Sequence, residues 1–159
     1  MSTLKVDNLQ ASSAARVLSP GHVIQVVTTT YSTQTSSTSS SYSDTGITAT
    51  ITPTSTSSKI LVLCNLCSAG VLNTNGADAD GNYKLLRGST DLMEARQRAY
   101  DYGNSGLIIF GQFLMSWLDS PSTTSATTYK LQQKITTGSS IRVSESNNPS
   151  VMHLLEVAQ

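Results

Sequence analysis

This sequence has little charge. Lys, Arg, Asp and Glu make up 13% of its 159 residues, against about a quarter in average soluble proteins. Ten basic residues balance ten acidic ones. A protein that binds nucleic acid or an anionic membrane surface needs a basic patch. We therefore expect neither nucleic acid nor membrane among its partners.

Cysteine and long apolar runs are also scarce. No apolar run reaches the ~18 to 20 residues of a membrane-spanning helix, and MSTLKVDNLQASS lacks the apolar core of a signal peptide. These features predict synthesis in a cytoplasm.

The two cysteines, Cys64 and Cys67, lie in the strand-like run KILVLCNLC. Residues three apart on a strand point to opposite faces, and a tetrahedral metal site needs two more ligands. We expect small buried side chains and no redox pair or zinc site.

Ser and Thr are abundant, at about three residues in ten, far above ordinary usage. From residue 21 onward, short β-like runs alternate with Gly, Pro, Asn and Ser clusters. GITATITP is the clearest, with Ile47, Ala49 and Ile51 on one side and Thr48, Thr50 and Thr52 on the other. Eight or nine such runs predict an all-β protein, a jelly-roll-like β-sandwich that forms a knob domain over 21–159.

Residues 1–20 predict an N-terminal arm and linker. LKVDNLQ alternates apolar and polar residues, with Leu4, Val6 and Leu9 as the apolar side, and ASSAARVLSPG ends on a Pro-Gly turn signal. The segment has too few apolar residues to fold alone. We expect the arm to pack on another protein of the same assembly.

The stretch DLMEARQRAYDYG differs from the rest because it holds five charges and has helical propensity, with Glu94 and Arg98 four residues apart. It predicts a long polar loop with one helical turn; the alternative is an irregular hairpin. Loops on a rigid sandwich often carry binding specificity. Glu94, Arg96, Arg98 and Tyr100 are therefore candidate receptor-facing residues.

Catalytic and metal motifs are weak. Asp78 and Asp80 precede Gly81 as in part of a calcium loop, but the twelfth position falls on Arg87. No Gly-x-Ser-x-Gly elbow is present, and His153, between Met152 and Leu154, is typical of an interior or interface histidine. We expect no enzyme activity, no cofactor and no metal. A host-polysaccharide-degrading enzyme is the rejected alternative, since carboxylate dyads need not be local in sequence.

LIIFGQFLMSWL, residues 107–118, is apolar on both faces of a strand. We expect the face with Leu107, Ile109, Phe113, Met115 and Trp117 to enter the sandwich core. The opposite face carries Ile108, Phe110, Gln112 and Leu114, the apolar and polar mixture of a subunit interface. Identical copies would cover this face around a symmetry axis. A bulge at Gly111 would exchange the two faces beyond it.

WLDSPSTTSATTYKLQ, residues 117–132, resembles a segment of the fibre and virion structural proteins of marine tailed phages, in particular cyanophages. MSTLKVDNLQ, PGHVIQVVTTTYS, SYSDTGITATITPTSTSSKILVL and SVMHLLEV resemble further segments of these proteins in the same order. Together they cover well over half of the chain. Residues 91–103 depart from the pattern.

The resemblance implies a non-enzymatic virion component, a homotrimer with an N-terminal attachment region and a β-rich distal domain. It implies a tail fibre-like protein that contacts the host surface, either a glycan or a protein. Because the sequence has no long shaft between arm and knob, a capsid decoration or head-fibre protein is the alternative.

Overall fold

Alternating side chains and frequent turn residues build a protein of strands. The computed structural model describes residues 19–74, 76–103 and 105–159, so the arm residues Leu4, Val6 and Leu9 lie outside it. The described residues form ten strands and one short 3₁₀ helix, η1 (Glu145–Asn147). The strands are β1 (Val23–Tyr31), β2 (Thr35–Ser37), β3 (Ser43–Ile51), β4 (Lys59–Asn73), β5 (Ala79–Arg87), β6 (Thr90–Ala99), β7 (Leu107–Asp119), β8 (Thr127–Thr137), β9 (Ser140–Val143) and β10 (Ser150–Val157).

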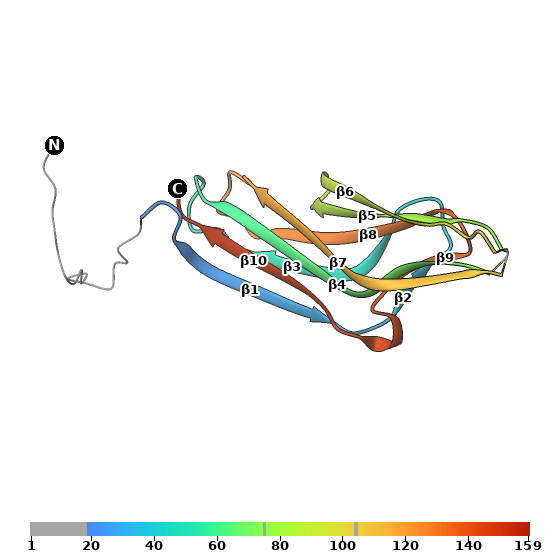
Figure 1. Ribbon diagram of the computed structural model, residues 1–159. Helices are drawn as coiled ribbons and strands as arrows, with labels where there is room; N and C mark the ends of the chain where they lie inside the picture. Colours follow the sequence, from blue (N-terminus) through green and yellow to red (C-terminus); the bar gives the residue numbers. More distant parts are fainter. Residues whose placement is uncertain (1–18, 75, 104) are drawn as a thin grey trace, which may run out of the picture.

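The strands pair into two antiparallel sheets that pack face to face (Figure 1). The main strands of the first sheet, sheet A, run in the order β1-β10-β4-β7, and the short β9 and β2 extend it beside the second half of β4. The second sheet, sheet B, has the order β3-β8-β5-β6. The eight long strands are therefore divided between the two sheets as in a jelly roll. This confirms the predicted all-β sandwich.

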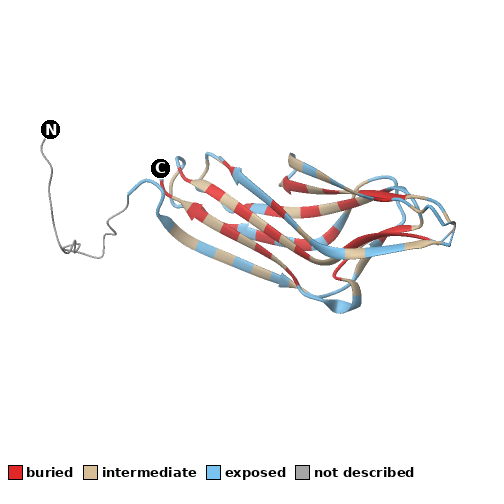
Figure 2. Cartoon of the chain, in the orientation of Figure 1, coloured by how far each residue is buried: buried red, intermediate tan, exposed pale blue. Residues whose placement is uncertain are grey.

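The core lies between the sheets and follows the predicted alternation. Ile47, Ala49 and Ile51 are buried, while the threonines between them are exposed. The largest fully buried side chains include Tyr83 and Tyr129 of sheet B. Figure 2 shows the same striping along most strands, with buried and exposed residues in alternation. Hydrophobic burial on one face of each sheet thus fixes which way every strand is turned.

The prediction of a polar loop with a helical turn at residues 91–103 is wrong for most of its length. Residues 90–99 form strand β6, which pairs antiparallel with β5. Met93, Ala95 and Ala99 pack against the core or enter it, and the charged residues between them face outward. A two-residue period of small apolar residues and cross-strand pairing outweigh the weak helical propensity here.

The predicted faces of β7 are correct only in part. Ile109 and Trp117, which were expected to enter the core, are 42% and 41% exposed because β7 is an edge strand of sheet A. Met115 is buried and Phe113 packs on the core. The bulge lies in the neighbouring strand β4, between Leu66 and Ala69, and not at Gly111. Because β7 keeps its alternation, one face remains outward from Ile108 to Leu118.

Candidate interaction surfaces

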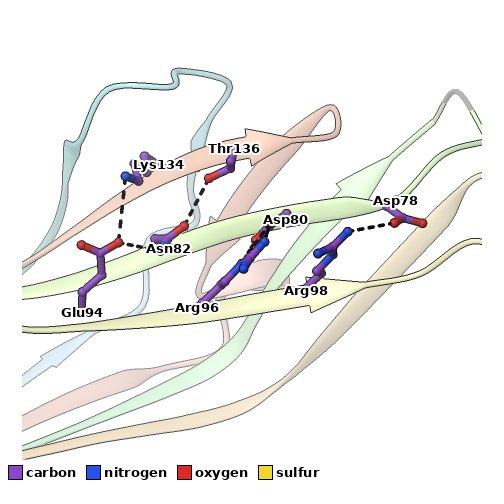
Figure 3. A network of polar contacts seen from close by, with 8 residues as sticks. All are labelled: Asp78, Asp80, Asn82, Glu94, Arg96, Arg98, Lys134 and Thr136. Carbon is purple, nitrogen blue, oxygen red and sulfur yellow. Dashed lines mark hydrogen bonds and ion pairs between the residues drawn. The ribbon is translucent and has the colours of Figure 1, made fainter.

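The outer face of sheet B is charged, and its charges pair with one another. Asp78 and side chains of β5 form hydrogen bonds and ion pairs with side chains of β6, in a cross-strand ladder (Figure 3). Its contacts are Asp78 with Arg98, Asp80 with Arg96, Asn82 with Glu94, and Lys84 with Asp91. The arginine–aspartate contacts are diagonal, since the strand register places Asp80 opposite Arg98 and Asn82 opposite Arg96. Opposite charges on neighbouring strands stabilise a sheet.

Asp80 is the most buried member of the ladder, at 3% exposure. Both of its carboxylate oxygens accept hydrogen bonds from Arg96, with Arg96 Nε 2.8 Å from Oδ1 and 3.0 Å from Oδ2. These bonds and the nearby positive charge hold the pKa of Asp80 below its usual value, although burial opposes the shift. Asp78 and Asp80 therefore serve as arginine partners in this structure.

The remaining candidates for chemistry are also accounted for by structural contacts. His153 lies on the outer face of sheet A, and its Nδ1 is 2.9 Å from the Thr28 hydroxyl. Cys64 is buried and Cys67 is half-buried, and both are free thiols. Within the described ranges, no group of three His, Cys, Asp or Glu side chains could hold a metal ion. The same residues include no helix long and apolar enough to cross a membrane.

The outer face of sheet A has the opposite chemistry. Met152 and Leu154 enter the core, so the alternate residues of β10 point outward, and the strand pairings align them with outward residues of β1, β4 and β7. Three rows cross the face: Val26, Leu155, Leu61 and Leu118; Thr28, His153, Leu63 and Ser116; and Thr30, Val151, Asn65 and Leu114. Seven of these twelve side chains are apolar and five are polar, and none of them is Lys, Arg, Asp or Glu. We call this surface the apolar face.

The four predicted interface residues lie on the apolar face or on its continuation along β7. Ile108 and Leu114 are 66% and 64% exposed. The exposed Gln112 donates to Cys67 Sγ at 3.8 Å. Phe110 is half-buried because its ring packs over Gly70: its Cδ1 would be 2.3 Å from a Cβ at that position. Figure 2 shows that β7 is exposed along most of its length. That these residues form a subunit interface remains a prediction.

The predicted receptor-facing residues are divided by the structure. Glu94, Arg96 and Arg98 belong to the charged ladder on β6, and only Tyr100 lies beyond the end of the strand. The rings of Tyr100 and Tyr102 stack with centroids 6.3 Å apart, and the Arg98 guanidinium lies 4.5 Å from the Tyr100 ring. Tyr102 is 94% exposed. Tyr102 is thus the side chain at this end of β6 that is most available to a ligand.

Sequence reasoning found the strand β7 but missed the breadth of the apolar face. KILVLCNLC has the same two-faced pattern, because Ile60, Val62 and Cys64 are buried while Leu61 and Leu63 point outward. SVMHLLEV likewise places Val151 and Leu155 outward. The signal was present in both strands, but only the pairing of distant segments shows that these residues form one surface.

Comparison with known proteins finds only distant similarity to solved structures. No family model and no curated protein matches it. The tripod from the baseplate of bacteriophage Tuc2009 is similar at 10% identity and a TM-score of 0.37, over 99% of this chain and 82% of that chain. The VP2 subviral particle of infectious bursal disease virus is similar at 15% identity and a TM-score of 0.46. That match covers 98% of this chain but only 38% of the VP2 chain. Similarity at this level assigns no function.

Proposed function

We propose that this protein is a non-enzymatic structural component of a phage virion, tail fibre-like, which joins the particle through residues 1–20 and presents the sandwich outward. The observation that carries the proposal is the placement of the chain ends and the loops. Gly21 and His22 hydrogen-bond to Ala158, so β1 begins beside the C-terminus. The β4–β5 and β6–β7 connections lie at the opposite end (Figure 1). A protein that is attached to the particle at one end and presents its loops at the other end needs this arrangement.

The two outer faces support a structural role. The charged ladder of sheet B satisfies its own charges, which suits a solvent-exposed surface. The apolar face of sheet A has no such cover within one copy, which suits self-assembly into a homotrimer. The acidic residues of the ladder are bonded to arginine, lysine or asparagine side chains. This pairing favours a structural role over hydrolysis of host polysaccharide.

The loop between β6 and β7 supports host contact at the far end. Exposed tyrosines are frequent at binding surfaces because they offer a large apolar ring and a polar tip at low entropic cost. Tyr100 and Tyr102 are such residues. We expect a host glycan or protein to contact them. A glycan array with wild type and with Tyr100→Ala plus Tyr102→Ala measures this directly.

Capsid decoration is the second candidate. It is favoured by the short distance between arm and knob, because β1 begins at Val23, directly after the arm. Both candidates predict that the protein is built into the particle, and they differ only in its position.

Deletion of residues 1–18 tests the proposal. We expect the truncated protein to keep the circular dichroism spectrum of a β-sandwich but to be absent from purified particles, while the full chain is incorporated. Gold labelling of the full chain then locates it at the tail or at the capsid. A full chain that never enters particles, or one that releases reducing ends from host polysaccharide, would show that the proposal is wrong.

A further inference from the structure

The exposed apolar side chains of the sandwich are concentrated at two edges of one sheet. Apart from Tyr100 and Tyr102, every large apolar side chain that is strongly exposed in the described residues belongs to β1 or β7. On β1 these are Val23 and Val26, and on β7 they are Ile108, Ile109, Leu114, Trp117 and Leu118. β1 and β7 are opposite edges of the four-strand part of sheet A. The strongly exposed apolar side chains therefore lie along both edges of the outer face, and at the β7 edge Ile109 and Trp117 extend onto the inward side.

The edge of β7 also lacks the protection that edge strands usually have. Native proteins place Lys, Pro or inward charges on an exposed edge to prevent pairing with other chains. β7 has 13 residues and no charged residue or proline before Asp119. The edge strand of sheet B, β6, instead carries Asp91, Glu94, Arg96 and Arg98. The contrast indicates that β7 is covered by another chain.

We infer that three copies of this chain turn the apolar faces of their A sheets toward a common axis, so that β7 of each copy packs against β1 of the next. This arrangement rests on the proposed structural role and names the partner of the apolar face, which is a second copy of the same chain. It is a heterologous contact, because two different edges meet, and such contacts close into rings. Without charges in the three rows, the face has no basis for attracting a charged partner.

The width of the face limits the number of copies. Four strands spaced about 4.8 Å apart make a face about 19 Å wide. Three such faces forming a triangular prism place each sheet about 5 to 6 Å from the axis, half of the ~10 Å at which sheets pack. Four faces would place each sheet about 9 to 10 Å from the axis and leave an open channel. With three copies, side chains of the three faces fill the space around the axis.

The area of the face is also sufficient. Strands of 8 to 13 residues rise about 3.3 Å per residue. The face then measures about 500 to 800 Å². Each copy of the ring divides this face between two neighbours, so the three faces together bury about 1,500 to 2,400 Å², comparable with the ~1,200 to 2,000 Å² total of a standard stable interface. A two-fold pair packed face to face would cover the three rows. It would leave Ile109 and Trp117 exposed, because both lie on the other side of the β7 edge.

Single substitutions at the two edges test the contact. Val26→Glu on β1 and Leu114→Glu on β7 each place a carboxylate where the next copy packs, with a desolvation penalty in every subunit. We expect the full chain to show a mass of three copies by light scattering and each variant to run as a monomer. Both side chains are more than half exposed in a single copy, so circular dichroism should be unchanged. Thr50→Glu, on the solvent-exposed side of β3, is the control and should remain a trimer.

Cross-linking tests the arrangement without disrupting it. Val26 and Leu118 lie in the same row, three strand spacings or about 14 Å apart within one copy. Val26→Cys with Leu118→Cys is made in a Cys67→Ser background and treated with a bismaleimide shorter than this separation. A ring predicts a covalent trimer on a denaturing gel. A product that stops at the dimer would indicate two-fold packing, and a monomer would indicate no contact; either result overturns the arrangement.

The two proposals can fail separately. A chain that is built into particles but cross-links only to a dimer would contradict the ring and leave the virion role intact. A chain that forms covalent trimers but is never found in particles would contradict the virion role and leave the ring intact.

Discussion

The Asp119 carboxylate and the Arg87 guanidinium join the two sheets at the end of the sandwich where β1 begins and β10 ends. Both carboxylate oxygens lie 2.7 Å from Arg87 Nη1. Asp119 is the last residue of β7 in sheet A, and Arg87 is the last residue of β5 in sheet B. The hydroxyl of Tyr129 donates to the same carboxylate at 2.7 Å. A buried acid thus ties the exposed strand β7 to the opposite sheet.

Asp119→Ala is expected to destabilise the protein by about 2 to 4 kcal/mol, because it leaves the arginine and the tyrosine hydroxyl without their shared acceptor in a buried site. Tyr129→Phe should cost less, about 1 kcal/mol, since Arg87 still satisfies the acid. Urea unfolding followed by fluorescence of Trp117 measures both. If both variants lost the same free energy of unfolding, the contact of Asp119 with Arg87 would contribute nothing measurable to stability.

Glu156 predicts how stability depends on pH. It is fully buried, and it accepts hydrogen bonds from the Gln25 amide at 2.6 Å and from Thr54 N and Oγ1 at 2.7 Å. Burial acts to raise its pKa, but hydrogen bonds from Ser58, Gln25 and Thr54 outweigh burial and lower it below 4.5. A lowered folded-state pKa stabilises the protein above the ordinary pKa and loses this contribution as pH falls.

Glu156→Gln should therefore lower the free energy of unfolding at pH 7 and reduce its difference between pH 7 and pH 3. Asp44 and Asp80 also have lowered pKa values, so some acid dependence should remain in the variant. Denaturant titrations at both pH values give the comparison. A variant with the same pH dependence as wild type would exclude Glu156 as a contributor.

Cys64 is buried as expected, whereas Cys67 is only half-buried, and we expect both to act as small structural side chains. Burial raises the pKa of the Cys64 thiol to about 12, so it stays neutral and unreactive at ordinary pH. Cys64→Ser with Cys67→Ser should leave assembly intact and cost about 1 to 3 kcal/mol, mostly at Cys64, where a hydroxyl would lack a partner. Dissociation of the wild type by a chelator or a mild reductant would contradict this assignment.

The sequence predicted most of the fold because its strands alternate strongly. GITATITP and the core face of β7 needed only a two-residue period. The strand at residues 90–99 was missed because its helical propensity and its Glu94–Arg98 spacing suggested a helix. The arginine–aspartate ladder joins the consecutive strands β5 and β6 and was missed because β6 was not recognised as a strand. The apolar face could not be predicted, because it depends on the pairing of strands that are distant in sequence, such as β1 with β10 and β10 with β4.

Asp80 and Arg96 offer a test of the ladder that replaces the predicted loop. Asp80→Ala should cost about 1 to 3 kcal/mol, because Asp80 is buried and its removal leaves Arg96 without its carboxylate. Arg96→Gln should cost at least as much, because it leaves the buried Asp80 carboxylate without its positively charged partner, whereas Asp80→Ala leaves an arginine side chain that is 56% exposed and that water can solvate. A double-mutant cycle measures the coupling, which we expect to be favourable and to weaken in high salt. Lys130→Gln, on the neighbouring strand β8, serves as the exposed-pair control and should change stability by less than about 1 kcal/mol. Additive losses at Asp80 and Arg96 would mean that the ladder does not hold β6 in register.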